Sequence, residues 1–276
     1  MRIVTDSTSD LPAALRDERA ITVVPLTVIF GPESFRDGVD LDSTAFYRRL
    51  RDFSGVVRTS QPSVDAFARA YESLPADCDI VSVHVASKLS GTLNSARSAA
   101  DMLGLGDRIR FVDSQTGSIG LGALALEAGA LAAEGLDADT IVAALERRVP
   151  HIHVYAAVDT LEYLRRGGRI GRASSLLGSL LAIKPVLRIR EGEILPFDRV
   201  RTKAKAIDRL VEVAVGTPRI SQVFVAGGDA DLETGRLAER LRDALGSVRV
   251  IVSTIGPTVG VHAGPGVVGI AVVEDS

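Results

Sequence analysis

The sequence predicts an α/β protein of two domains, an N-terminal parallel-sheet domain over residues 1–150 and a C-terminal mixed α/β domain over residues 151–276. Short β-branched runs alternate with segments of helical spacing up to about residue 150, which indicates a parallel sheet. Beyond that point the pattern changes, because a hairpin interrupts the alternation. A chain of 276 residues with 46% hydrophobic residues can fill the cores of two ordinary domains.

In the first half, three of the expected strands are followed by a polar segment and a helix. The expected strands cover 3–5, 21–29, 81–85 and 109–112, with a turn at 31–34 and a returning arm at 35–39. The expected helices begin near residues 12, 43, 64, 92, 119 and 140. We expect Asp10 to cap the first of these helices, with Pro12 in its first turn, and Ser63 to cap the third.

Loops rich in serine, threonine and aspartate precede four of these helices. They contain Asp6 and Ser7, Thr59 and Ser60, residues 87–92, and Asp113 and Ser114. In open parallel sheets ligands collect outside the carboxyl ends of the strands. We therefore expect these four loops to line one crevice.

The segment 81–97 is the most informative of these units. Its strand leads through a hydroxyl-rich loop to a helix, with Gly91 where the helix should begin. The free N–H groups of such a helix start, with Ser90 and Thr92 as extra donors, favour an anion. The alternative is that Ser90 simply caps the helix, which serine commonly does.

Composition excludes several classes of protein. Aromatic residues make up only 4%, tryptophan is absent and the net charge is -3, so we expect no nucleic-acid partner. The single cysteine, Cys78, rules out an intramolecular disulfide and a multi-cysteine metal site. The N-terminus lacks a signal-peptide layout and no apolar run is long enough for a membrane span, which predicts a cytoplasmic protein with at most transient membrane contact.

We expect no cofactor. The glycines of residues 120–125 superficially match a dinucleotide fingerprint, but they fall inside a helix instead of at its first turn. Close helix packing explains them better. His151 and His153 share one face of a strand beginning near residue 150, where they form either a metal site or a polar face. Without a third ligand nearby, we favour the polar face.

The second half continues with a short helix at 159–164 and an arginine- and glycine-rich segment at 165–172. That segment either binds an anion or an acidic partner, or forms a solvated turn. Next comes a helix at 174–181, whose apolar stripe is Leu176, Leu177, Leu180 and Leu181. The remaining elements are a hairpin of 186–189 and 194–200, a helix from 202 to 215, strands at 222–226, 248–253 and 267–273, and a helix at 231–245.

Residues 255–266 are expected to form a loop, because glycines and prolines surround a single histidine, His262. Such a loop lets backbone approach a ligand closely. His262 is then either a hydrogen-bond donor to a carboxylate or a structural residue.

Taken together, these motifs resemble those of the DegV family. The matching segments, in the family's order and spread over nearly the whole chain, are residues 5–11, 59–63, 87–92, 113–114, 166–170, 184–185, 199–202 and 256–266. The resemblance implies a two-domain α/β protein that binds one long-chain fatty acid between its domains. It also implies a role as the binding subunit of a bacterial fatty acid kinase, which presents the acid to a separate ATP-dependent kinase that makes the acyl phosphate.

The resemblance also implies site residues. The carboxylate-holding positions match Thr59, Ser90 and His262, with Ser60 and Thr92 nearby. Arg169 and Arg201 match arginines near the carboxylate or at the kinase-docking face. For the tail pocket, the best local candidate is the stripe of Leu176, Leu177, Leu180 and Leu181, whose alternative role is ordinary core.

The rival hypothesis is a stand-alone enzyme that uses Asp6, Asp113 or His262 on a phosphorylated or acyl small molecule. The sequence contains no nucleophile elbow and no phosphate-binding loop with lysine, which disfavours this hypothesis. We therefore expect a lipid-binding protein without a catalytic centre of its own.

Overall fold

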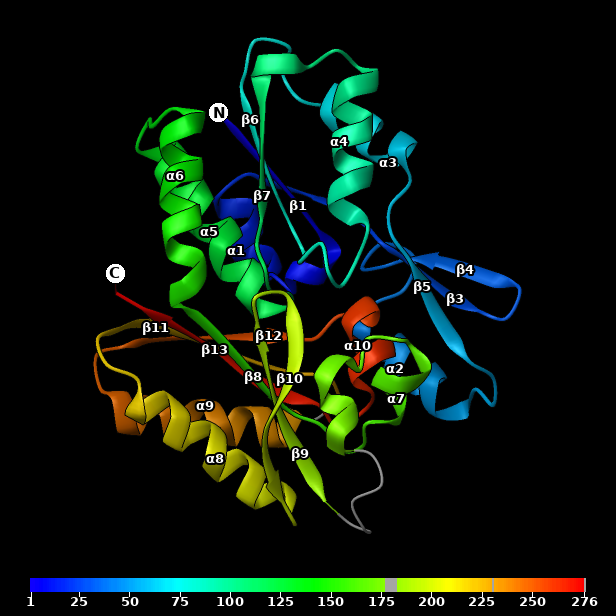
Figure 1. Cartoon of the computed structure of the whole chain (residues 1–276), viewed down its shortest axis with the longest axis vertical. Helices are drawn as coiled ribbons and strands as arrows, with labels where there is room; N and C mark the ends of the chain where they lie inside the picture. The colour runs from blue at the N-terminus through cyan, green and yellow to red at the C-terminus, as the bar shows by residue number, and fades with distance from the viewer. Residues whose placement is uncertain (177–182, 230, 276) are drawn as a thin grey trace.

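The computed structural model describes residues 1–176, 183–229 and 231–275. Its N-terminal half contains a parallel sheet of four strands in the order β2-β1-β6-β7, drawn in the upper half of Figure 1. The strands are β1 (Arg2–Asp6), β2 (Ile21–Val24), β6 (Ile80–His84) and β7 (Ile109–Asp113). The predicted parallel sheet is thus confirmed.

Helices cover both faces of this sheet. On one face α3 (Val64–Glu72) and α4 (Thr92–Met102) pack over a core cluster that includes Val4 and Phe67. On the other face lie α5 (Ile119–Ala133) and α6 (Ala138–Arg148), while α1 (Ala13–Glu18) contacts β2. The predicted Ser63 cap of α3 is confirmed, because its hydroxyl accepts the N–H of Ala66 at 3.1 Å.

A small antiparallel sheet in the order β4-β3-β5 lies beside the parallel one. Its strands are β3 (Thr27–Phe30), β4 (Glu33–Arg36) and β5 (Val57–Ser60), and α2 (Ser43–Asp52) packs against its core. The single strand predicted over 21–29 is therefore wrong, since Pro25 and Leu26 separate β2 from β3 in another sheet. Residues 59 and 60, expected in a loop, end β5 because they pair with Val28 and Thr27.

The C-terminal half forms a mixed sheet of six strands in the order β10-β9-β8-β13-β11-β12. The strands are β8 (Ile152–Ala157), β9 (Lys184–Arg190), β10 (Glu193–Val200), β11 (Ile220–Gly227), β12 (Arg249–Thr254) and β13 (Val268–Glu274). Helices α8 (Lys203–Gly216) and α9 (Asp231–Leu245) cover one face. The other face packs against α5, which therefore lies between the two large sheets (Figure 1).

Glycines allow α5 to approach β8 on one side and the backbone that follows β1 on the other. A Cβ on Gly120 would lie 2.5 Å from Val154 Cγ2, and one on Gly122 would lie 2.5 Å from the Ser9 carbonyl oxygen. The prediction that these glycines serve close packing is confirmed. The largest core cluster accordingly contains residues of both halves, such as Ile3, Leu124 and Ala271.

Three predicted local structures differ in the folded chain. Residues 255–266 are not a loop, because α10 (Pro257–Ala263) forms there with proline in its first turn and Gly264 at φ 80° after its end. The predicted helix at 159–164 is displaced to α7 (Glu162–Arg166). In place of the start of the helix predicted at 174–181 there is a 3-10 turn, Gly171–Leu176, and residues 177–181 lie outside the described residues.

Asp10 does not cap α1, contrary to the prediction. It adopts the left-handed region at φ 48°, and Pro12 occupies the cap position before Ala13. The carboxylate of Asp10 binds groups far away in the sequence, as described below. Within the residues that the structure describes, no helix is both long and apolar enough to cross a membrane.

Candidate ligand-binding site

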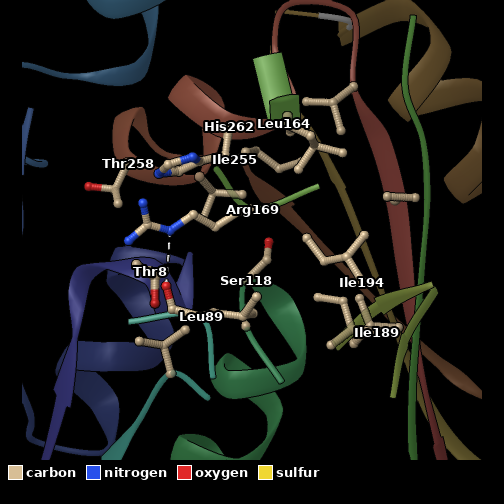
Figure 2. A pocket seen from close by; sticks show the side chains of 18 of the residues that line it. Thr8, Leu89, Ser118, Leu164, Arg169, Ile189, Ile194, Ile255, Thr258 and His262 are labelled. Carbon is tan, nitrogen blue, oxygen red and sulfur yellow. Dashed lines mark hydrogen bonds between the residues drawn. The ribbon is translucent and has the colours of Figure 1, made fainter. Parts of the chain in front are cut away.

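A cavity of about 340 Å³ lies between the two halves of the chain. Its walls come from β5, β8, β9, β13, the N-terminal end of α5, α10 and the loop before α4. Most of its lining is apolar, as Figure 2 shows for Leu89, Leu164, Ile189, Ile194 and Ile255. This volume falls in the range of pockets that hold small molecules.

Thr59 and His262 meet at the polar end of the cavity, although 203 positions separate them in the chain. The Oγ1 atom of Thr59, on β5, lies 2.8 Å from Nε2 of His262, on α10. Gly167 passes so close to the imidazole that a Cβ there would collide with Nδ1. Glycine at position 167 is therefore required for the imidazole to lie where it does.

The surroundings of His262 keep its ring neutral. Burial, and next the positive charge of Arg169, lower the pKa of His262 to about 4. Its Nδ1 is buried without a hydrogen-bond partner. Because a buried orphan N–H is costlier than an orphan acceptor, we assign the proton to Nε2, which then donates to Thr59. The hydroxyl hydrogen of Thr59 is left for a ligand.

Ser90 is the second hydroxyl whose oxygen accepts hydrogen bonds from the protein and whose hydrogen is left for a ligand. Its Oγ lies 2.8 Å from Thr92 Oγ1 and 3.3 Å from the backbone nitrogen of Thr92, the first residue of α4. Either hydroxyl can donate in the contact with Thr92 Oγ1, and we assign Thr92 as the donor because Ser90 Oγ already accepts the Thr92 N–H. With this assignment the Ser90 hydrogen is left for the cavity, which Ser90 lines. Thr92 itself is fully buried behind Ser90. Gly91 occupies the N-cap of α4, so the alternative that Ser90 is the cap residue is wrong.

Arg169 places a positive charge at the same end. Its Nε donates to the Leu89 carbonyl at 3.1 Å, drawn as a dashed line in Figure 2, and its Nη1 donates to the Gly167 carbonyl at 2.8 Å. No carboxylate among the described residues pairs with this guanidinium. An arginine held by carbonyl groups keeps its charge available for an anion.

Three buried aspartates form a second layer behind the cavity. Each anchors one residue of the lining: Asp6 accepts the hydroxyl and N–H of Thr8, Asp10 accepts the hydroxyl of Ser118 at 2.5 Å, and Asp37 accepts the N–H of Thr258 at 3.2 Å. Asp10 also accepts the Gly256 N–H at 2.8 Å, and Asp37 the Ser7 hydroxyl at 2.8 Å.

Burial raises the pKa of Asp10 well above its usual value, and the charges of Asp37 and Asp6 act in the same direction. Burial likewise raises the pKa of Asp37, against the hydrogen bonds from Thr258 and Ser7. Sequence reasoning missed this layer, because most of its contacts join distant residues, such as Asp10 and Ser118, which are 108 positions apart. The only local signal is the alternation of aspartate and hydroxyl residues over 5–10.

The structure brings most of the predicted polar residues together and leaves some apart. Thr59, Ser60, Ser90, Arg169 and His262 all line the cavity, and the Ser60 hydroxyl donates to the Gln61 carbonyl at 3.2 Å. Thr92 and Arg201 are not among the lining residues. Of the predicted tail stripe, Leu176 is buried in the main core cluster, and Leu177, Leu180 and Leu181 lie outside the described residues.

His153 of β8 and His151, which ends the 3-10 turn before that strand, form a polar face, as predicted. His153 Nε2 lies 3.1 Å and His151 Nδ1 4.0 Å from Glu274, which ends β13. The described part of the chain holds no cluster of three or more histidine, cysteine or acidic residues suited to a metal ion.

The fold and the cavity together define a class of protein: two α/β halves that enclose an apolar slot with one polar, cationic end. The chain belongs to the DegV family, because the family model, described as an uncharacterised protein of that family, matches residues 1–275. A DegV domain-containing protein of Streptomyces coelicolor is 40% identical, with 98% of this chain and 97% of the relative covered. The protein DegV of Bacillus subtilis is 34% identical, with 97% of each covered.

Solved structures resemble the whole chain. A DegV family protein from Thermus thermophilus, described by its fatty acid binding, superposes with a TM-score of 0.90 at 35% identity and covers 100% of both chains. DegV from Bacillus subtilis, described as a fatty acid binding protein, gives a TM-score of 0.89 at 32% identity over 99% of each chain. The α/β fold predicted from the sequence is therefore shared with these proteins.

Proposed function

We propose that this protein binds one long-chain fatty acid in the cavity, with the carboxylate at Thr59, Ser90, His262 and Arg169 and the tail along the apolar wall. The single observation that carries the proposal is this polar, cationic end on a mostly apolar slot. The similar proteins of Thermus thermophilus and Bacillus subtilis, which are described as fatty acid binding, support it.

The carboxylate end needs donors that are not already used. A charge taken out of water is costly unless hydrogen bonds replace its hydration. Thr59 and Ser90 each receive hydrogen bonds through their oxygens, which leaves their own hydrogens for the ligand. Arg169 adds the opposite charge. The site thus offers two hydroxyl donors and one guanidinium to one carboxylate.

The tail end supplies most of the attraction. Burying a sixteen-carbon chain at about 0.8 kcal/mol per CH₂ contributes on the order of 10 kcal/mol before the costs of binding. Apolar side chains such as Leu187, Ile189 and Ile194 provide the surface for this burial. Such an energy suits a carrier that must hold a detergent-like ligand.

Comparing palmitate with its methyl ester tests the proposed site. Both ligands have the same tail, but the ester has no charge for Arg169 and no carboxylate for Thr59 and Ser90. We expect delipidated protein to bind palmitate at one molecule per chain and the ester at least about tenfold more weakly, since hydrogen bonds to charged groups contribute about 1.5–3 kcal/mol. Equal binding of the two ligands, or binding of neither, contradicts the proposal.

We further propose that a separate ATP-dependent kinase phosphorylates the bound acid to an acyl phosphate. The exposed position of Arg169 at the carboxylate end supports this step, because a partner can reach that end of the cavity. The test is to trap acyl phosphate with hydroxylamine in reactions with MgATP, with and without a bacterial fatty acid kinase. Product only with the kinase agrees with the proposal, whereas turnover without it favours a stand-alone enzyme.

A further inference from the structure

The hydroxyl groups around the cavity are of two kinds. Those of Thr59 and Ser90 accept hydrogen bonds from groups behind them and keep their hydrogens free. The hydroxyls of Ser118 and Thr8 do the opposite, because each donates its hydrogen to a buried aspartate. Toward the cavity these two therefore present lone pairs, which repel a carboxylate.

Ser118 and Asp10 are held in unusual conformations to make this contact. Asp10 has φ 48° and Ser118 has φ 53° with ψ -142°, regions that residues other than glycine rarely adopt. Ser118 also occupies the N-cap of α5, yet its side chain does not cap that helix. Figure 2 shows its oxygen directed into the cavity, below Arg169.

The surroundings of Asp10 favour a proton on its carboxyl group. It is only 7% exposed, and the charged groups that act on it are Asp37 and Asp6, both acidic. Tyr47 is a neutral neighbour, because burial and then the charge of Asp10 raise the pKa of its phenol. Within the described chain, Asp10 has hydrogen bonds from Ser118 and Gly256 and no ion pair with a basic side chain.

We propose that Asp10 and Ser118 form a proton-dependent donor switch for the carboxylate ligand, an inference that rests on the proposed fatty acid binding. A proton from solvent binds Oδ2 of Asp10, and the new O–H donates to Ser118 Oγ. The Ser118 hydroxyl then rotates and directs its hydrogen into the cavity. Oδ1 continues to accept the Gly256 N–H, so that no covalent bond changes and α10 stays in place.

Binding of the acid and of this proton therefore support each other. The bound carboxylate gains a third hydroxyl donor, and the added negative charge favours protonated Asp10. Affinity falls as the pH rises through the raised pKa of Asp10, because the ionised carboxylate takes the Ser118 hydrogen back. Asp10 acts as a positioning residue, and Ser118 is the group that touches the ligand.

A double-mutant cycle tests the switch with palmitate as the probe, from the acidic to the alkaline end of the pH range in which the protein stays folded. In Asp10→Asn the amide mimics the protonated acid, since its oxygen accepts the Gly256 N–H and its NH₂ donates to Ser118. We expect wild-type affinity to fall about tenfold as the pH rises, while D10N stays constant and binds about tenfold tighter than wild type at the upper end. Adding Ser118→Ala should remove this gain.

The switch is contradicted if the palmitate affinity of D10N depends on pH as that of wild type does. It is also contradicted if the gain in affinity of D10N persists in the double variant with S118A, since the loss of the Asp10 charge alone would then explain the gain. Asp101→Asn, an exposed position on α4, serves as the matched control and should keep the wild-type profile. A ligand-free readout separates this inference from the proposed function. The infrared carbonyl band of a protonated carboxylic acid should be present in wild type and weaker in D10N; its absence from wild type contradicts the switch even if no fatty acid binds.

Discussion

His262 illustrates how the surroundings of one side chain set its protonation. The imidazole is buried beside a guanidinium, and both effects lower its pKa to about 4 from an ordinary 6.5. With its single proton assigned to Nε2, because Nδ1 has no partner, neutral His262 donates to Thr59. The chemistry of the polar end therefore depends on a ring that stays uncharged at neutral pH.

This pKa has a consequence for stability. Between about pH 6.5 and 4 the unfolded chain binds a proton at His262 that the folded chain does not, so the free energy of unfolding decreases as the pH falls through this range. Between these two pH values the free energy of unfolding decreases by an amount on the order of 3 kcal/mol. We expect chemical denaturation to show that the free energy of unfolding of wild type falls toward pH 4 more steeply than that of His262→Gln, so that the advantage of wild type shrinks. A constant difference contradicts the assigned environment.

Ser90 offers the direct residue-scale test of the carboxylate site. Ser90→Ala removes a donor to a charged group without changing the backbone, so we expect about tenfold weaker fatty acid binding, measured by titration calorimetry. Ser73→Ala is the control, because that hydroxyl is exposed and donates to the Ala70 carbonyl at 2.7 Å. Equal affinities of S90A and S73A would place the carboxylate elsewhere.

Residues with a local signature were predictable, and residues defined by distant contacts were not. Ser90 precedes a helix after a strand, and Thr59 and His262 belong to motifs of the family. Ser118 gave no signal, because a serine at positive φ cannot be recognised in a sequence. Asp10 gave a misleading one, since aspartate before Pro12 resembles an N-cap.

At the scale of elements, α5 decides how the two sheets meet. It presents Gly120 to β8 and Gly122 to the backbone after β1. Its N-terminal end also lines the cavity through Ser118 and Ile119. The spacing of glycines in this helix therefore positions one wall of the candidate site.

Gly122→Ala tests this packing. The added methyl group would meet the Ser9 carbonyl oxygen at 2.5 Å, which is backbone, so we expect a loss of about 1–3 kcal/mol in the free energy of unfolding. Gly235→Ala in α9 is the matched control, because nothing lies within 4 Å of its Cβ position. That change should stabilise the protein by about 0.5–1 kcal/mol. Similar effects of the two substitutions in denaturant titrations would contradict the packing role.

The α/β alternation in the first half predicted most helices and strands, because their apolar periodicity is strong. The prediction for 255–266 was wrong because glycine and proline were interpreted as breakers, while Gly256 and Pro257 form a proper helix start. Buried contacts of Gly260 with Phe46 and Tyr47 then favour close helix packing. Tertiary contacts of this kind outweigh local propensity.

At the scale of the whole molecule, the cavity lies where the two large sheets meet through α5, with α10 as a further wall. Residues before and after position 150 both contribute to the described walls of the cavity and to the largest core cluster. The domain boundary near residue 150 therefore stays a prediction. Of the polar end, only Ser90 lies in a loop that follows a strand of the parallel sheet, as the sequence predicted, whereas Thr59 lies in β5 and His262 in α10. The sequence did not locate the apolar wall of β8, β9 and β10, because the approach of one sheet to another leaves no local pattern.

Native mass spectrometry of the purified protein, followed by extraction and identification of what it carries, tests the central claim most directly. We predict one bound fatty acid of about fourteen to eighteen carbons per chain, since the apolar wall makes release of such a tail costly. Protein that is empty and also fails to take up added palmitate or oleate would contradict the assignment of this cavity to a fatty acid.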